Sequence, residues 1–242
     1  MKINSKTQRC KWGWMLVAAG LVQSAGMAAW AQGAAGGSAC AGHLEVGTRV
    51  TGFRLEDSSR SSDDRFYGSI DKLDAVQDYW PIKVFVDYNV NPYWGIDLTW
   101  DQVQADTITK EDGHNDGTLN VGGPIASVFV RYPGLAWMVP YAGGGVAYYF
   151  SEFNEENSWR YPPSNPGIRQ QTFHPDDAVG WVVYAGVSVQ VVEHWYADLY
   201  VRHTGVSVKG EHDVDVYYEV QTGDFKFPLD NDAIGLGVRY AF

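Results

Sequence analysis

The chain ends on the stretch Ala233-Ile234-Gly235-Leu236-Gly237-Val238-Arg239-Tyr240-Ala241-Phe242. Side chains of a β-strand alternate between two faces, so one face here would carry the apolar set Ile234, Leu236, Val238, Tyr240 and Phe242. The other face would carry small residues and Arg239. This period of two predicts a strand with one strongly apolar face that runs to the last residue.

This ending resembles the terminal strand of bacterial outer-membrane β-barrels, which finishes on an aromatic residue after alternating apolar positions. The resemblance implies that the barrel-assembly machinery reads Val238, Tyr240 and Phe242 as an assembly signal. A soluble protein could also bury the apolar face in a sandwich, with this segment as an ordinary edge strand. The rest of the chain has to separate these two interpretations.

The start of the chain has the three parts of a secretory signal peptide. They are the cations Lys2, Lys6, Arg9 and Lys11, an apolar stretch at 12–22 and the cleavage site Ala29-Trp30-Ala31. We therefore predict a signal peptide at 1–31 and a flexible tail at 32–42. The apolar stretch is too short and too interrupted for a membrane-spanning helix of about 20 residues. Because Cys10 is lost on cleavage, Cys40 remains alone and no intramolecular disulfide is expected.

The composition fits an exported β-protein. Cleavage would leave 211 of the 242 residues, a length within the range of one all-β domain. The whole chain has 18 Lys and Arg against 29 Asp and Glu, and losing four cations with the signal peptide gives a formal net charge of −15. Such acidity argues against nucleic acid as a partner.

Eight segments alternate with the period of a strand. They are 44–55, 82–90, 94–101, 119–132, 139–150, 180–190, 195–202 and 233–242. Long polar connections at 56–78, 106–118, 151–178 and 203–232 follow every second segment, and the other connections are short. Alternate connections of an up-and-down barrel lie at opposite ends, so all long loops would emerge together. We predict an all-β fold over 43–242, an eight-stranded antiparallel up-and-down transmembrane β-barrel with long extracellular loops and short periplasmic turns.

Three places in these segments call for local explanations. Phe53 and Leu55 break the alternation of the first segment, which indicates a bulge near its upper end. The fourth segment changes phase around Gly123-Pro124. The glycines at 143–145 remove side-chain bulk where a neighbouring strand or side chain comes close.

Ten charged residues lie opposite the apolar faces of the segments. They are Glu45, Arg49, Lys83, Asp87, Asp97, Asp101, Arg131, Asp198, Arg202 and Arg239. They would face water in a soluble barrel and a polar lumen in a membrane barrel. Aromatic residues favour the membrane barrel, because they form two bands at opposite strand ends, as at the two interfaces of a membrane. One band near the short turns contains Trp94, Trp137, Trp195, Tyr240 and Phe242, and the other near the long loops contains Trp80, Trp100, Tyr149 and Trp181. In a narrow lumen we expect the ten charges to form a paired ladder.

Among eight-stranded outer-membrane barrels, the chain resembles the OmpW family. The similarity lies in Pro140-Tyr-Ala-Gly-Gly-Gly-Val-Ala-Tyr-Tyr-Phe150, in the glycine-rich segment 180–190 followed by one that starts at Trp195, and in the closing residues 237–242. This resemblance implies a barrel of the bacterial cell outer membrane that passes small, mainly apolar compounds and holds no cofactor. The long acidic connections depart from a close match, so a neighbouring porin-like family with the same scaffold stays open.

Two short clusters combine carboxylates with an imidazole and are weak candidates for a metal site. They contain Asp112, His114 and Asp116, and Glu211, His212 and Asp213. Carboxylate oxygens suit a divalent cation such as Ca²⁺, but neither cluster has the spacing of an EF-hand loop. Solvated acidic loops are the alternative, and no metal is assigned.

Eight-stranded barrels also include enzymes that modify lipid A, and a deacylase of this kind needs His-x-Ser. Here His203 is followed by Thr204, and the next serine is Ser207. On a strand His203 and Ser207 would be about 13 Å apart, too far for a nucleophile and its base to share a hydrogen bond. We therefore assign no catalytic residue.

A structural or adhesive barrel that contacts lipopolysaccharide is a third class of function, and the sequence does not distinguish it from a passage. The expected partners are outer-membrane lipids and lipopolysaccharide, the assembly machinery and, for a passage, small apolar solutes. The chain is expected to act as a monomer without nucleic acid.

Overall fold

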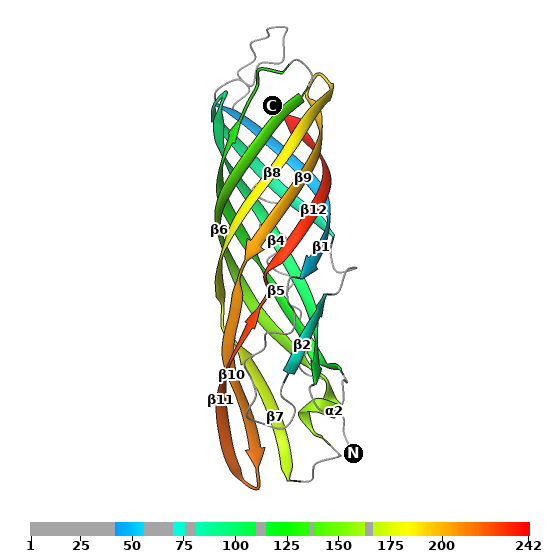
Figure 1. Cartoon of the computed structure of the whole chain (residues 1–242), viewed down its shortest axis with the longest axis vertical. Coiled ribbons are helices and arrows are strands. Elements are labelled where there is room, and N and C mark those ends of the chain that lie inside the picture. The colour runs from blue at the N-terminus through cyan, green and yellow to red at the C-terminus, as the bar shows by residue number, and fades with distance from the viewer. Residues whose placement is uncertain (1–41, 56–69, 76–80, 110–114, 136–137, 163–166) are drawn as a thin grey trace, which may run out of the picture. The chain divides into compact units, whose positions relative to one another are not determined.

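The computed structural model describes residues 42–55, 70–75, 81–109, 115–135, 138–162 and 167–242. Eight of its strands pair in one closed antiparallel barrel (Figure 1). They are β1 (His43–Leu55), β3 (Ile82–Asn91), β4 (Trp94–Thr109), β5 (Asn115–Arg131), β6 (Met138–Glu155), β8 (Ala178–Val192), β9 (Trp195–Gly205) and β12 (Asn231–Ala241). Each pairs with the next, and β12 pairs with β1. The predicted barrel is confirmed, while the signal peptide and residues 32–41 lie outside the described ranges.

The terminal strand β12 has the orientation of a membrane barrel. Leu236 on its apolar face is 66% exposed, whereas Arg239 on the other face is 5% exposed. Tyr240 and Phe242 lie on the same outer side as Leu236, and their rings are 5.0 Å apart. The chain therefore turns its apolar strand face outward and its charges inward, which is the reverse of a soluble barrel.

The predicted bulge and the predicted change of phase are both wrong. β1 pairs with β12 without a register shift as far as Leu55, and β5 pairs with β4 in one register through Gly123 and Pro124. Phe53 and Leu55 continue the inward face of β1 and are partly buried there. The alternation does not slip in β1 or in β5 from Gly117 to Arg131. The chemistry of the inward residues changes instead, from charged to apolar, because the upper interior is an apolar core.

The long connections, predicted as loops, contain further regular structure. β2 (Ile70–Ala75) pairs with β4 above the end of β3. β7 (Ile168–Pro175), β10 (Ser207–Val216) and β11 (Glu219–Pro228) form a separate three-stranded sheet, and α2 covers Asn157–Arg160. Figure 1 shows this sheet at the end opposite the C-terminus, at the bottom of the picture. We call this end the upper part of the barrel and the end near the short turns and the C-terminus the lower part. In the described part of the chain, no helix has the length and apolarity of a membrane span.

These upper elements close over an apolar core. Its largest members are Tyr149, Trp159, Phe173, Phe225 and Phe227, and smaller apolar residues of β4, β5 and β8 fill the space between them. Phe173 stacks on Phe225 with ring centroids 3.7 Å apart. Tyr149 was predicted in the outer aromatic band, but it is 1% exposed and points inward. The rings that do face outward at this level include Trp100 and Trp181.

Candidate functional site

All ten charged residues predicted for the lumen are buried inside the barrel. Strands β1, β3, β4, β5, β9 and β12 supply them, because the inward position recurs every second residue on each strand. Their ion pairs fall into two groups, one around Arg239 and one around Asp101. An ion inside a protein has lost its hydration, so such charges are tolerated only when partners replace the lost water.

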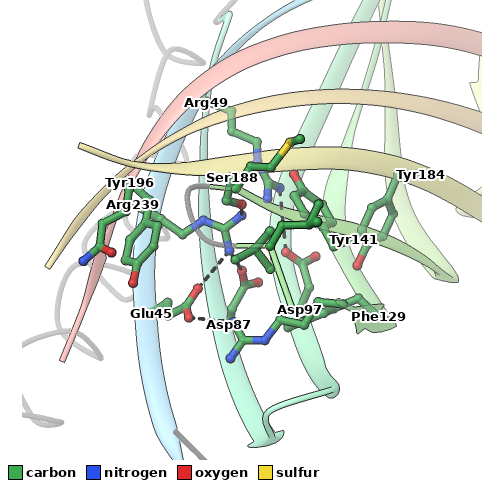
Figure 2. A pocket seen from close by; sticks show the side chains of 15 residues that line it. Glu45, Arg49, Asp87, Asp97, Phe129, Tyr141, Tyr184, Ser188, Tyr196 and Arg239 are labelled. Carbon is green, nitrogen blue, oxygen red and sulfur yellow. Dashed lines mark hydrogen bonds and ion pairs between the residues drawn. The ribbon is translucent and has the colours of Figure 1, made fainter. Parts of the chain in front are cut away.

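Arg239 lies at the centre of the larger group (Figure 2). Its Nη1 is 2.8 Å from Glu45 Oε2 and 3.3 Å from Asp87 Oδ2, and its Nη2 is 2.5 Å from Asp198 Oδ1. Nη2 also donates a hydrogen bond to the hydroxyl of Ser188. One guanidinium therefore connects β12 to β1, β3, β8 and β9.

Two more guanidiniums complete this group. Arg49 Nε lies 2.9 Å from Asp198 Oδ2, and Arg49 Nη1 lies 3.8 Å from Asp97 Oδ2. Arg131 Nη1 lies 2.9 Å from Glu45 Oε1. Three cations thus meet four carboxylates in the half of the lumen nearer the short turns.

The smaller group is centred on Asp101, at the upper end of the charged lumen. Arg202 Nη2 is 2.8 Å from Asp101 Oδ2, and Lys83 Nζ is 3.3 Å from Asp101 Oδ1. Tyr149 donates a hydrogen bond of 2.9 Å to the same carboxylate. Since Tyr149 also belongs to the apolar core, this residue marks the level where the charged lumen ends.

Sequence reasoning did not assign a role to the aromatic residues of the lumen. Arg49 Cζ lies 3.7 Å from the centre of the Phe85 ring and 4.6 Å from that of Tyr200. Tyr141 donates to both oxygens of Asp198 at 2.9 Å. These rings lie on the same inward face as the charged residues. The alternation of side chains along each strand could therefore have predicted their place in the lumen.

Two glycines make room for these rings. A Cβ at Gly143 would lie 2.6 Å from the ring of Tyr184, and one at Gly186 would lie 2.4 Å from the ring of Tyr141. The close approach of a ring explains Gly143 of β6, as the sequence indicated. At Gly145 the neighbouring backbone comes close instead, because a Cβ there would lie 2.1 Å from the Ala126 carbonyl oxygen.

The charged lumen is almost filled. A void of about 50 Å³ remains among Arg131, Arg239, Tyr141 and their neighbours. About 10–15 Å³ of such volume is enough to hold one water, so this void has room for a few waters. The arrangement can hold water and charge in place, but it is too tight for a solute to travel along the axis.

Two seams of the barrel wall are interrupted in the described residues. The pairing of β3 with β4 ends at Phe85 and Thr99, and β2 pairs with β4 only from Ala105 onward. β5 pairs with β6 from Gly117 to Gly122 and again from Ile125 to Arg131, but the pairing skips Gly123 and Pro124. Proline has no backbone N–H to contribute to a ladder. The interruption between β5 and β6 lies where the apolar core meets the charged lumen, because Gly123 pairs with Asp101 of β4 while the apolar Val121 and Ile125 flank it on β5.

The predicted metal clusters do not converge. Asp112 and His114 lie outside the described residues, and Asp116 is buried. In the second cluster His212 points into the apolar core and stacks on Trp159, whereas Glu211 points to the outside of β10 and Asp213 shares its side of the strand. The described residues contain no group of three or more side chains suited to a metal ion.

The catalytic pattern is also incomplete in the described residues. His203 Nδ1 lies 2.9 Å from Asp232 Oδ1 on the outer wall. Thr204, the next residue, is fully buried on the opposite face of β9. Ser207 belongs to the following strand, β10, so the order His-x-Ser is not reproduced in space.

Residues 15–242 match the family model of the outer membrane protein beta-barrel domain. The structure is similar to OprG from Pseudomonas aeruginosa, with 14% identity, a TM-score of 0.60 and coverage of 84% of this chain and 97% of that one. It is also similar to AlkL in lipid bilayers (14% identity, TM-score 0.60, coverage 89% and 95%) and to outer membrane protein W of E. coli (14%, 0.51, 84% and 100%). No curated protein sequence matches the chain. The predicted resemblance to small eight-stranded outer-membrane barrels is confirmed.

Proposed function

Because the chain belongs to the outer membrane protein beta-barrel domain family, and is thus a protein of the bacterial outer membrane, we propose that it is a narrow passage for small apolar compounds. The observation that carries this proposal is the division of the interior. Ion pairs and tyrosines fill the lower lumen, and apolar side chains line the upper interior. A hydrophilic solute has no open axial path, whereas an apolar solute matches the lining above.

The interruption of the pairing between β5 and β6 supports a sideways exit. A compound held by the upper core reaches the Asp101 group and meets paired charges, where an apolar solute would lose contacts without gaining any. At the same level the pairing of β5 with β6 skips Gly123 and Pro124. Trp100 and Phe150 are exposed on the outer wall here, so the exit would open onto the hydrocarbon of the membrane. We propose that solutes leave between β5 and β6 beside Pro124.

The test replaces Pro124 with valine, which restores the backbone N–H and suits a lipid-facing strand position. Cells that carry the native protein should take up the apolar dye N-phenyl-1-naphthylamine faster than cells without it. The Pro124→Val variant should lose most of this difference. Planar bilayers with the native protein should show small and unsteady conductance.

Pro140 provides a matched control, because it also lies within a barrel strand but at the other end of β6. Its pairing with Val187 is continuous, so Pro140→Val should leave dye uptake within about twofold of native. Equal uptake by native cells and cells without the protein would contradict the passage. A steady, large conductance that admits sugars would contradict the closed lumen.

A further inference from the structure

The hairpin of β10 and β11 ends in two exposed tyrosines with an uncommon backbone. Tyr217 and Tyr218 form its two-residue turn, between the paired residues Val216 and Glu219. Both have positive φ, 50° and 78°, and they are 73% and 82% exposed. Turns of this type favour Asn-Gly, because a larger side chain strains the left-handed backbone. The chain accepts strain in order to place two aromatic rings at this tip.

The two rings are also held in place rather than left loose. A Cβ at Gly167 would lie 2.9 Å from Tyr217 Oη, so the ring of Tyr217 rests on the backbone of Gly167. The Tyr217 N–H donates a hydrogen bond of 3.2 Å to the Gly167 carbonyl. Arg169 Cζ lies 4.6 Å from the centre of the Tyr218 ring, and Arg169 Nη1 is 3.5 Å from Asp215. One side of each ring is supported, and the rings remain largely open to solvent.

Strained backbone and fixed, exposed tyrosines together indicate a binding surface. We propose that the pair Tyr217 and Tyr218, the tyrosine tip, binds uncharged sugar units of the polysaccharide of lipopolysaccharide in the same membrane. The C–H face of a sugar ring stacks on the electron-rich face of an aromatic ring, and tyrosine hydroxyls and nearby carboxylates bond to sugar hydroxyls. Glu219 flanks the tip, is exposed and supplies such a carboxylate.

Charge selects neutral sugars over anionic ones. The hairpin carries five carboxylates and two lysines, namely Glu211, Asp213, Asp215, Glu219, Asp224, Lys209 and Lys226. This excess of negative charge repels phosphate and sulfate groups. The height of the tip above the membrane surface also favours neutral sugars. Gly205, the last residue of β9, lies beside the outward Trp181, and the ten residues of β10 extend about 33 Å beyond it. The tyrosine tip would therefore stand above the phosphorylated headgroups, among the outer sugars.

The test uses the full chain in detergent micelles and the double substitution Tyr217→Asn with Tyr218→Gly. This pair of residues suits the turn better than two tyrosines, so the hairpin should stay folded while the rings are lost. The probe is the uncharged polysaccharide released by mild acid from the lipopolysaccharide of the producing bacterium, measured by calorimetry. We expect the native protein to bind it and the double variant to bind at least tenfold more weakly.

Tyr161→Asn serves as the control, since Tyr161 is an exposed tyrosine outside the hairpin. The affinity of this variant for the polysaccharide should stay within about twofold of native. Dye uptake should be unchanged in the double variant, which separates this inference from the proposed passage. Equal affinity of the native protein and the double variant would overturn the inference. Binding only to lipid A, to heparin, to glycans from other sources or to a protein partner would overturn it as well.

Discussion

The lower and upper parts of the barrel have opposite interiors, although the same strands run through both. On β5 the inward residues Ser127 and Arg131 of the lower part are polar, whereas Leu119 and Val121 of the upper part are apolar. The outer faces differ in the opposite sense. Val128 on β5 is exposed below, and the exposed residues of β10 and β11 above are mainly polar and charged.

The surrounding solvent explains this difference. Where lipid surrounds the wall, apolar residues face outward and the interior must satisfy its own polar groups. Where water surrounds the wall, the ordinary rule returns and apolar residues gather inside. We therefore expect the outer edge of the membrane hydrocarbon near the level at which the two patterns meet, at Gly123 and Pro124 on β5.

The largest expected effect comes from Phe242→Asp, because assembly should depend on the lower part alone. Phe242 lies on the outer side of the last strand, and its N–H bonds to Leu44 of the first strand. We expect the variant to lose nearly all heat-modifiable barrel from the outer membrane, as seen on gels before and after boiling. Removal of the turn residues 216–219 should leave assembly intact. Normal assembly of the Phe242 variant would refute the role of the C-terminal signal.

Arg239→Met tests whether the lower interior depends on charge. The variant leaves Glu45, Asp87 and Asp198 without their shared cation, and breaking such a buried pair costs about 3–5 kcal/mol. Urea unfolding in phospholipid vesicles measures the loss. Arg169→Met removes the exposed ion pair with Asp215 and should cost under about 1 kcal/mol. Similar losses of unfolding free energy in the two variants would contradict the difference between buried and exposed ion pairs.

Phe227→Ala tests the apolar core of the upper part. Phe227 is fully buried there, and truncation of a buried phenylalanine costs about 3–5 kcal/mol. The loss should be local, so protease added to whole cells should cut the β10–β11 region faster while the remaining barrel still migrates as a folded species. Complete loss of the folded barrel would show that the two parts are not independent in stability.

Leu236→Arg has the smallest of these effects and tests the outer wall. Arginine on the lipid face costs about 2–4 kcal/mol near the bilayer midplane. The control is Thr222→Arg on β11, an exposed position in the watery part, where the expected change in unfolding free energy is within about 0.5 kcal/mol. Equal changes at the two positions would place the membrane boundary elsewhere.

The barrel strands were readable from the sequence because an outward apolar face repeats without interruption, as at Ile234, Leu236 and Val238. The strands of the upper part were not, because their inward positions mix types. On β10 the inward set Val208, Gly210 and His212 includes a glycine and a histidine, and acidic residues lie between them. This composition has the appearance of a solvated loop. Only pairing with β7 and β11 reveals the strand.

The membership of the charged lumen was predictable, but its pairing was not. Strand parity places Glu45 and Arg239 inside, yet these residues are 194 positions apart in the chain. Their contact depends on the register in which the last strand meets the first, and periodicity does not contain that register. The same limit applies to Tyr141 and Asp198, whose hydrogen bonds cross the interior from β6 to β9.

The position of Arg239, three residues before the C-terminal Phe242, has a consequence for the kinetics of folding. The four carboxylates of its group come from earlier strands, and its three contacts with them form only when the last strand closes the cylinder. Before closure these carboxylates repel one another. After closure, opening the seam between β1 and β12 exposes several charges at once to a poorly hydrated space. The barrel should therefore open slowly, and its lifetime in the membrane should depend more on this barrier than on the equilibrium free energy of unfolding.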